Sequence, residues 1–231
     1  MSEAERQAAV DALPSLVPMD LHPPEGDKHS GAKDGAASAL DAFFRRVGQK
    51  VYVSKELATY YPNEPMFCPD VLAVREVETH PREKWVVSSE GKGLDFVLEV
   101  HVKGDRQKDF ETNVRRYARL GIPEYFVFDR SRLRLAGWRL AAPDARVYEP
   151  LVPQAGRFHS QVLQLDLAVE VERLRFFFGT APLPEAEELV AQLESIVSDV
   201  SARAEQEAAR AEALEARLAE VLSELDKLRS R

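Results

Sequence analysis

The most regular hydrophobic pattern of the chain lies between residues 94 and 129, where apolar and polar positions first alternate and then take helical spacing. The alternation over 95–103 predicts a β-strand, because successive side chains of an extended chain point to opposite faces. One face would be apolar (Phe96, Leu98, Val100, Val102) and the other ionisable (Asp95, Glu99, His101, Lys103). Strands of an α/β domain are normally covered on both faces, so the ionisable face indicates a sheet edge or a chemical site.

The residues that follow predict a crossover helix and a second strand. Apolar residues recur at three- and four-residue steps over 106–120, as expected for one buried helical stripe. Asp105 is suited to cap this helix, and Gly121 with Pro123 behind it should end it. Residues 124–129 (EYFVFD) predict a short, strongly apolar strand.

Shorter elements precede this unit. Helical spacing of apolar residues predicts a helix over 28–47, and short apolar runs predict strands over 51–54, 57–61 and 71–74. Asp70 directly precedes the last of these strands, where a solvated or capping role is the alternative to a role in catalysis. His29, at the start of the helix, is expected to be a surface or locally bonded group, although catalysis stays open. The charged residues 76–93 predict a loop.

Short apolar pieces over 133–140, 146–148, 162–171 and 174–178 predict strands that complete the body. After Pro184 neither glycine nor proline occurs, and apolar residues alternate four- and three-residue steps, which predicts a coiled-coil seam. Alanines over 204–211 leave this seam weak or shifted in phase. We therefore expect an extended lead-in over 1–27, a domain over 28–180 and a helical coiled-coil tail over 181–231. The tail should make a homo-oligomer; packing of its first half on the body is the alternative.

Composition and charge narrow the classes of protein. Of 231 residues 45% are hydrophobic, enough for one substantial domain and an appendage. The net charge is −8, but 12 of the 39 acidic and 6 of the 31 basic residues follow residue 180, so residues 1–180 carry only −2. A nearly neutral body does not exclude nucleic acid. The chain shows no signal peptide and no run of ~18 apolar residues, so we expect a cytoplasmic protein with no membrane partner.

The single cysteine, Cys68, excludes an intramolecular disulfide and any thiolate metal cluster within one chain. It is expected to be a small buried thiol before Pro69.

The order α-β-β-β-α-β, with Asp70 on the second strand and Glu99 on the third, resembles the core of the PD-(D/E)XK nuclease superfamily. More closely, Pro69-Asp70-Val71, the segment 94–100 (LDFVLEV), Asp109, Tyr117 and the segment 121–129 (GIPEYFVFD) resemble the Uma-type putative restriction endonuclease family. The resemblance runs from about residue 29 to residue 178. It implies an α/β fold, a restriction-endonuclease-like mixed sheet with flanking helices, here followed by the long C-terminal coiled-coil helix.

The resemblance also implies metal-assisted hydrolysis of DNA phosphodiester bonds. Two carboxylates from adjacent strands can hold Mg²⁺ or Mn²⁺, hard cations that prefer oxygen ligands and lower the pKa of a bound water. By carry-over, Asp70 and Glu99 would be the metal ligands, with Asp95 as an auxiliary. A nearby lysine would orient the nucleophile or offset developing charge.

The expected lysine is missing from its usual places. The position two residues after Glu99 is His101, and the alternative position on the following helix is Asn113. Lys103 shares the predicted face of Glu99 but lies one pleat beyond His101, about 7 Å further along the strand. Basic and polar groups on the turn and helix (Arg106, Lys108, Asn113, Arg116) are the predicted nucleic-acid contacts, with a solvated helix face as the alternative.

Two interpretations therefore stand. In the first, Asp70, Glu99 and Lys103, with Asp95 or His101 as auxiliary, form a Mg²⁺-dependent DNA endonuclease. In the second, the nuclease fold has weak or no catalysis, and the protein acts as an oligomeric DNA-binding or adaptor module.

Overall fold

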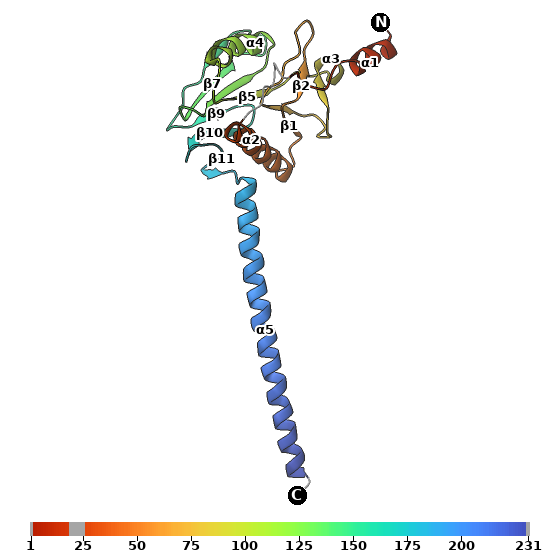
Figure 1. Ribbon diagram of the computed structural model, residues 1–231, viewed down its shortest axis with the longest axis vertical. Coiled ribbons are helices and arrows are strands. Elements are labelled where there is room, and N and C mark those ends of the chain that lie inside the picture. The colour runs from red at the N-terminus through yellow and green to blue at the C-terminus, as the bar shows by residue number, and fades with distance from the viewer. Residues whose placement is uncertain (1, 19–25, 230–231) are drawn as a thin grey trace. The chain divides into compact units, whose positions relative to one another are not determined.

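The computed structural model describes residues 2–18 and 26–229, which form two compact units that meet between Pro184 and Glu185. In the first unit, the central layer is a six-stranded sheet in the order β1-β3-β5-β6-β7-β8 (Figure 1). Its strands are β1 (Val51–Lys55), β3 (Val71–Arg75), β5 (Phe96–His101), β6 (Glu124–Asp129), β7 (Arg134–Leu140) and β8 (Tyr148–Pro150). Only β5 and β6 run parallel, and the other neighbours are antiparallel. The predicted mixed α/β sheet is confirmed.

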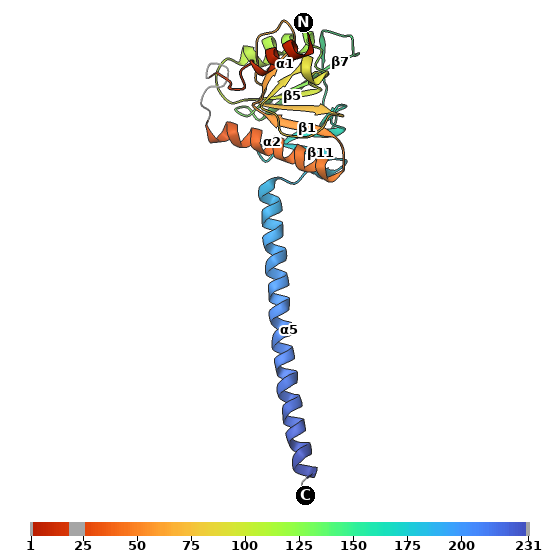
Figure 2. The same cartoon turned by 90° about the vertical axis from the view of Figure 1, so that its right-hand side faces the viewer.

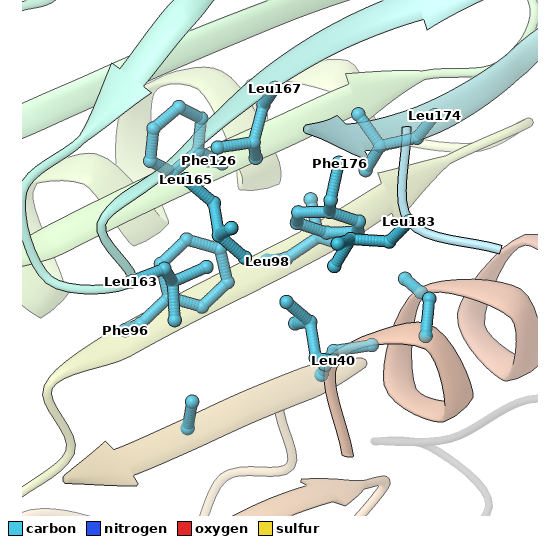
Figure 3. Close-up of a cluster of buried hydrophobic side chains, with 14 of the residues drawn as sticks. Leu40, Phe96, Leu98, Phe126, Leu163, Leu165, Leu167, Leu174, Phe176 and Leu183 are labelled. Atoms are coloured by element: carbon cyan, nitrogen blue, oxygen red, sulfur yellow. The ribbon is translucent and has the colours of Figure 1, made fainter. Parts of the chain in front are cut away.

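One face of this sheet packs against α2 (Asp27–Arg46) and a second, antiparallel sheet. The second sheet contains β9 (Phe158–Ser160), β10 (Leu165–Glu170), β11 (Arg173–Phe178) and β12 (Ala181–Pro182). Figure 3 shows the shared core, where Leu40 of α2 meets Leu98 of β5 and Phe176 of β11. This core holds α2 firmly against the strands that carry the candidate acids.

The opposite face packs against the segment between β5 and β6. That segment begins near Asp105, whose Oδ1 accepts the N–H of Gln107 at 2.9 Å, and it ends at Gly121, which has a left-handed φ of +75°. Between these points the helix is not uniform. Residues Lys108–Thr112 form a π-helical turn (η1), and Asn113–Arg119 form the α-helix α4. A π turn inside a helix widens it locally and is frequent at functional sites.

The predicted loop over 76–93 is wrong in part, because it contains β4 (Lys84–Val86) and the short helix α3 (Val87–Glu90). β4 pairs in parallel with β2 (Ala58–Tyr60). Trp85 anchors this segment: its ring is fully buried and stacks on Tyr52, and its Nε1 donates to the Lys92 carbonyl at 3.0 Å. Aromatic burial therefore outweighed the charged composition of the segment.

The extended lead-in predicted over 1–27 is also wrong in part, because Glu3–Asp11 form the helix α1. A capping box starts it: the Ser2 hydroxyl accepts the N–H of Glu5, and the Glu5 carboxylate accepts the N–H of Ser2. The prolines that suggested extended chain come after this helix. Residues 19–25 of the predicted lead-in lie outside the described residues.

The second unit is one helix, α5 (Ala186–Arg229), of 44 residues (Figure 2). The prediction of a long C-terminal helix is confirmed. Within residues 2–18 and 26–229, no helix is both long enough and apolar enough to span a bilayer.

Candidate active site

Two carboxylates meet where β3 begins beside β5. The antiparallel register pairs Val71 with Leu98, which places the preceding residue, Asp70, opposite Glu99. The backbone N–H of Asp70 donates to Glu99 Oε2 at 3.4 Å, and the N–H of Val100 donates to Asp70 Oδ2 at 2.7 Å. Both acids are buried, with residue exposures of 8% for Asp70 and 5% for Glu99. The structure thus brings together the two acids that the sequence motif singled out.

Helix α2 brings two basic side chains to the same point. His29 Nε2 lies 3.1 Å from Asp70 Oδ2, and Lys33 Nζ lies 3.9 Å from Asp70 Oδ1. The Lys33 side chain is 1% exposed and also forms an ion pair with Glu56, which follows β1. Sequence reasoning left His29 open and missed Lys33. The signal was present, because Lys33 stands three residues before Ala36 and seven before Leu40, on the stripe that faces the core.

The environments of the two acids drive their protonation in opposite directions. Burial acts to raise the pKa of Asp70, but contacts with His29, the Val100 N–H and Lys33 outweigh it, so the pKa lies below its ordinary value. Burial raises the pKa of Glu99 well above its ordinary value, and the nearby charges of Asp70 and Asp109 raise it further. An ionised acid beside a protonated one is what two close carboxylates adopt without a cation between them.

A buried histidine–aspartate pair lies next to Glu99. His101, two residues further along β5, places Nδ1 2.8 Å from Asp109 Oδ2, and Asp109 comes from the π turn. Burial raises the pKa of Asp109, and the hydrogen bond with His101 offsets part of this effect. The wider π turn therefore presents a carboxylate to the strand.

Two tyrosines fix the positions of these carboxyl-bearing residues. Tyr117 Oη donates to Glu99 Oε1 at 2.6 Å, and Tyr125 Oη donates to the Asp109 carbonyl at 2.9 Å. Their rings meet edge to face, with centroids 4.9 Å apart. Burial raises the pKa of both phenols well above the ordinary value, so both act as hydrogen-bond donors at neutral pH.

Cys68, two residues before Asp70, is half-buried and is not a reactive thiolate. Burial raises the pKa of its thiol to about 12, and the charges of Glu99, Asp70 and Glu56 add to the effect. A thiol in this state is a poor nucleophile.

A model of the Uma2 family, described as "Putative restriction endonuclease", matches residues 16–172, which is more than half of the chain. The chain belongs to the Uma2 family. The resemblance drawn from the sequence is thereby confirmed. No curated protein matches the chain. Among solved structures, it is similar to a crystal structure of a putative nuclease belonging to DUF820 from Anabaena variabilis ATCC 29413. The identity is 16%, the match covers 57% of this chain and 73% of that one, and the TM-score is 0.43.

Asp95 and Lys103 of this Uma2 protein lie apart from the acid pair. Asp95 precedes β5, where its Oδ2 accepts the N–H of Arg75 at 2.7 Å and lies 3.1 Å from Lys92 Nζ. Four residues of strand, about 13 Å, separate it from Glu99. Strand β5 ends at His101, and Lys103 is exposed in the bend that follows, so strand geometry does not hold it on the face of Glu99.

The predicted nucleic-acid contacts of this Uma2 protein divide into exposed and occupied groups. Lys108 and Arg106 are exposed, but Arg106 also has internal partners: its Nε donates to Asp129 Oδ2 at 3.5 Å and its Cζ lies 3.8 Å from the Phe110 ring centre. Asn113, by contrast, is only 4% exposed, because it stands on the buried side of α4. Arg116 donates to Glu64 Oε1 and to the Pro65 carbonyl, each at 2.8 Å. The structure therefore gives Asn113 and Arg116 internal partners, Tyr125 and Glu64, in place of an open surface position.

The donor set suits a magnesium-type cation that completes its shell with water and substrate. Within the described part of this Uma2 chain, no three His, Cys, Asp or Glu side chains gather in a way that could hold a metal alone. Mg²⁺ is commonly held by one or two carboxylates plus waters and phosphate oxygens. Asp70 and Glu99 fit that requirement, because two carboxyl groups from neighbouring strands lie together at the start of β3.

Proposed function

We propose that the chain is a metal-dependent DNA endonuclease that hydrolyses phosphodiester bonds at the Asp70–Glu99 pair. Membership of the Uma2 family supports nuclease activity in general. The observation that carries the specific proposal is the convergence of Asp70 and Glu99 at the start of β3, with the Asp70 N–H donating to Glu99.

In this proposal Asp70 and Glu99 hold Mg²⁺ or Mn²⁺. Such a cation, when bound, would activate a water molecule and offset charge on the scissile phosphate. The Val100 N–H orients Asp70, and the Tyr117 hydroxyl orients Glu99, so both acids are positioned before substrate arrives.

Lys33 supplies the positive charge that the family pattern would place on the third strand. It approaches Asp70 from α2 and is almost completely buried, so it acts on the chemistry through Asp70 and Glu56. Together with His29 it holds Asp70 ionised. We regard both as positioning residues.

His101 is suited to accept the proton released by the attacking water. Asp109 occupies Nδ1, which leaves Nε2 as the ring atom that can take a proton. His101→Gln should lower the cleavage rate by a factor of roughly 10²–10⁴ while Mn²⁺ binding is retained. Loss of Mn²⁺ binding in that variant would show that His101 supports the metal site and would contradict its role as the proton acceptor.

DNA would lie across the exposed surface formed by Lys103, Arg106 and Lys108, between β5 and the π turn. These side chains follow the strand that carries Glu99, so a phosphate backbone held there passes close to the acid pair. We further propose that the protein acts in the cytoplasm and self-associates through α5.

A second candidate function is an inactive nuclease fold that serves as a DNA-binding or adaptor module. The observation that favours it is the same pair of α2 groups: Lys33 and His29 already compensate the charge of Asp70. Under this alternative, they take the place of the metal and no hydrolysis follows.

Cleavage of supercoiled plasmid with Mg²⁺ or Mn²⁺ distinguishes the two. The endonuclease proposal expects nicked or linear product from the parent chain and at least a hundredfold slower cutting by Asp70→Asn and Glu99→Gln. The matched controls Asp166→Asn, on β10, and Glu149→Gln, on β8, change exposed or half-exposed acids in other strands and should cut like the parent. If both site variants still cut the plasmid, Asp70 and Glu99 are not the catalytic site. If the parent chain does not cut with either Mg²⁺ or Mn²⁺, the DNA-binding or adaptor function is favoured.

A further inference from the structure

Helix α5 carries one uninterrupted heptad register from Val190 to Leu228. Twelve positions fall on the a/d seam at alternating three- and four-residue steps, and eleven are apolar: Val190, Leu193, Val197, Val200, Ala204, Ala211, Leu214, Leu218, Val221, Leu225 and Leu228. The twelfth is Glu207. The alanines therefore continue the seam in phase, where the sequence pattern had suggested a weak or shifted segment. A repeat sustained over this length is the pattern of a coiled coil.

The large side chains of this seam are exposed. Among the described residues, exposures along it run from 45% at Val221 to 70% at Leu214 and Leu228. A helix of 44 residues is about 66 Å long, so the apolar stripe extends over many turns. Such a stripe requires a partner that presents an equally long apolar face.

The residues that flank the seam select the orientation of that partner. Between residues 203 and 217 the g positions of α5 are Arg203, Arg210 and Arg217, and the e positions are Ala208 and Glu215. In a parallel, in-register pair each g residue faces the e residue five positions later on the other helix. Arg210 then faces Glu215 of the second copy, and no like charges meet there.

The antiparallel arrangement brings like charges together instead. With the two helices fully overlapped, g positions face g positions, so Arg203 would face Arg217 and Arg210 would face its own copy. Like charges at such positions destabilise a coiled coil. The charges at the g and e positions thus favour the parallel pair.

Glu207, the one charged seam residue, favours exact register. Its Oε1 accepts from Arg210 Nη1 of the same helix at 2.9 Å. In register, both copies of Glu207 meet in a single layer, where the Arg210 bound to each of them offsets their like charges. A shift of one heptad would set each Glu207 against Val200 or Leu214, which makes two polar–apolar layers in place of one. A single polar core residue is a known determinant of register.

We propose that α5 binds a second copy of this chain as a parallel, in-register, two-stranded coiled coil. Chain connectivity then joins both N-terminal units to the same end of the coiled coil. The inference uses only α5 and does not depend on the proposed nuclease activity.

Cysteine cross-linking of the full chain tests the orientation. Leu214→Cys and Leu228→Cys each place a thiol at a d position, where the two copies in a parallel pair come close enough for a disulfide. Both variants should form covalent dimers under mild oxidation. The control Ala216→Cys, on the outer face of the helix, and the parent, which has only Cys68, should not.

Molecular mass in solution completes the test. Sedimentation should give about twice 26.0 kDa for the parent and the monomer mass for the double variant Leu218→Glu/Leu225→Glu, whose N-terminal unit should keep its near-ultraviolet circular dichroism. A monomeric parent, or an assembly larger than two, would overturn the proposal. So would a Leu228→Cys chain that cross-links only with a Val190→Cys chain, because that result requires antiparallel helices.

Discussion

Lys33 Nζ lies 3.9 Å from Asp70 Oδ1, although β1 and β2 separate α2 from β3 in the chain. The contact joins a helix and a strand end that the sequence pattern treated as independent. It places a nearly fully buried cation beside the candidate metal ligand, and Glu56 completes the ion pair. We expect this arrangement to matter for both stability and activity.

Replacing Lys33 by methionine should destabilise the protein strongly. The change leaves Asp70 and Glu56 without their shared cation, and breaking a buried pair in this way costs about 3–5 kcal/mol. The half-exposed position of Glu56 should bring the loss toward the lower figure. Lys55→Met is the matched control, because Lys55 pairs with Asp34 at the surface and should cost less than about 1 kcal/mol. Urea denaturation of the three proteins measures the difference, and equal losses for both variants would contradict the role of Lys33.

The raised pKa of Glu99 predicts that the free energy of unfolding of the metal-free protein depends on pH. Above the ordinary value of 4.5 the unfolded chain releases this proton while the folded chain retains it, so the free energy of unfolding falls as pH rises toward the folded pKa. Glu99→Gln removes the titration but keeps an oxygen that can accept from Tyr117. With a chelator present, the variant should therefore gain stability relative to the parent as pH is raised from 4.5 to 8.

Chemical denaturation at several pH values checks this expectation. The comparison must be between parent and variant, since burial also raises the pKa of Asp109 and Glu124. A parent–variant difference that does not change with pH would show that Glu99 titrates normally.

Lys108 and Arg116 should behave differently in DNA binding. Lys108 is exposed beside the site, so Lys108→Ala should weaken binding to any sequence and reduce the salt slope by about 1. Arg116 is held by Glu64 and stacks over Phe67, so Arg116→Ala should lower stability and leave the salt slope unchanged. Fluorescence anisotropy with a labelled duplex between 50 and 200 mM salt separates the two. A reduced salt slope for Arg116→Ala would instead show that Arg116 contacts a DNA phosphate.

The spacing of hydrophobic residues correctly predicted the helices and strands that depend mainly on the local order of apolar and polar residues. Strand β6 has the predicted bounds, Glu124–Asp129, because a short apolar run between a glycine–proline turn and a polar turn has few other ways to be buried. Asp70 and Glu99 were predicted from the resemblance of their sequence motifs to a nuclease family. The antiparallel register of β3 and β5 explains why these two residues lie together in the fold.

Features that depend on tertiary contacts could not be predicted in the same way. Lys33 lies on a helical stripe that was identified only by its apolar members, and its burial becomes favourable only when Glu56 and Asp70 arrive from other elements. The π turn that presents Asp109 to His101 has no spacing signature of its own. Lys103 was placed by extending the strand alternation two residues beyond the point where β5 ends.

The proposed endonuclease activity requires that Asp70 and Glu99 together hold one divalent cation. Titration of Mn²⁺ into the parent chain, followed by the loss of the free-ion electron paramagnetic resonance signal, measures it most directly. We expect one ion bound per parent chain and at least a tenfold weaker affinity in Asp70→Asn and in Glu99→Gln, with the Asp166→Asn control unchanged. Equal Mn²⁺ affinity in the parent and both site variants, or no binding by the parent at millimolar Mn²⁺, would show that these two acids do not form the metal site.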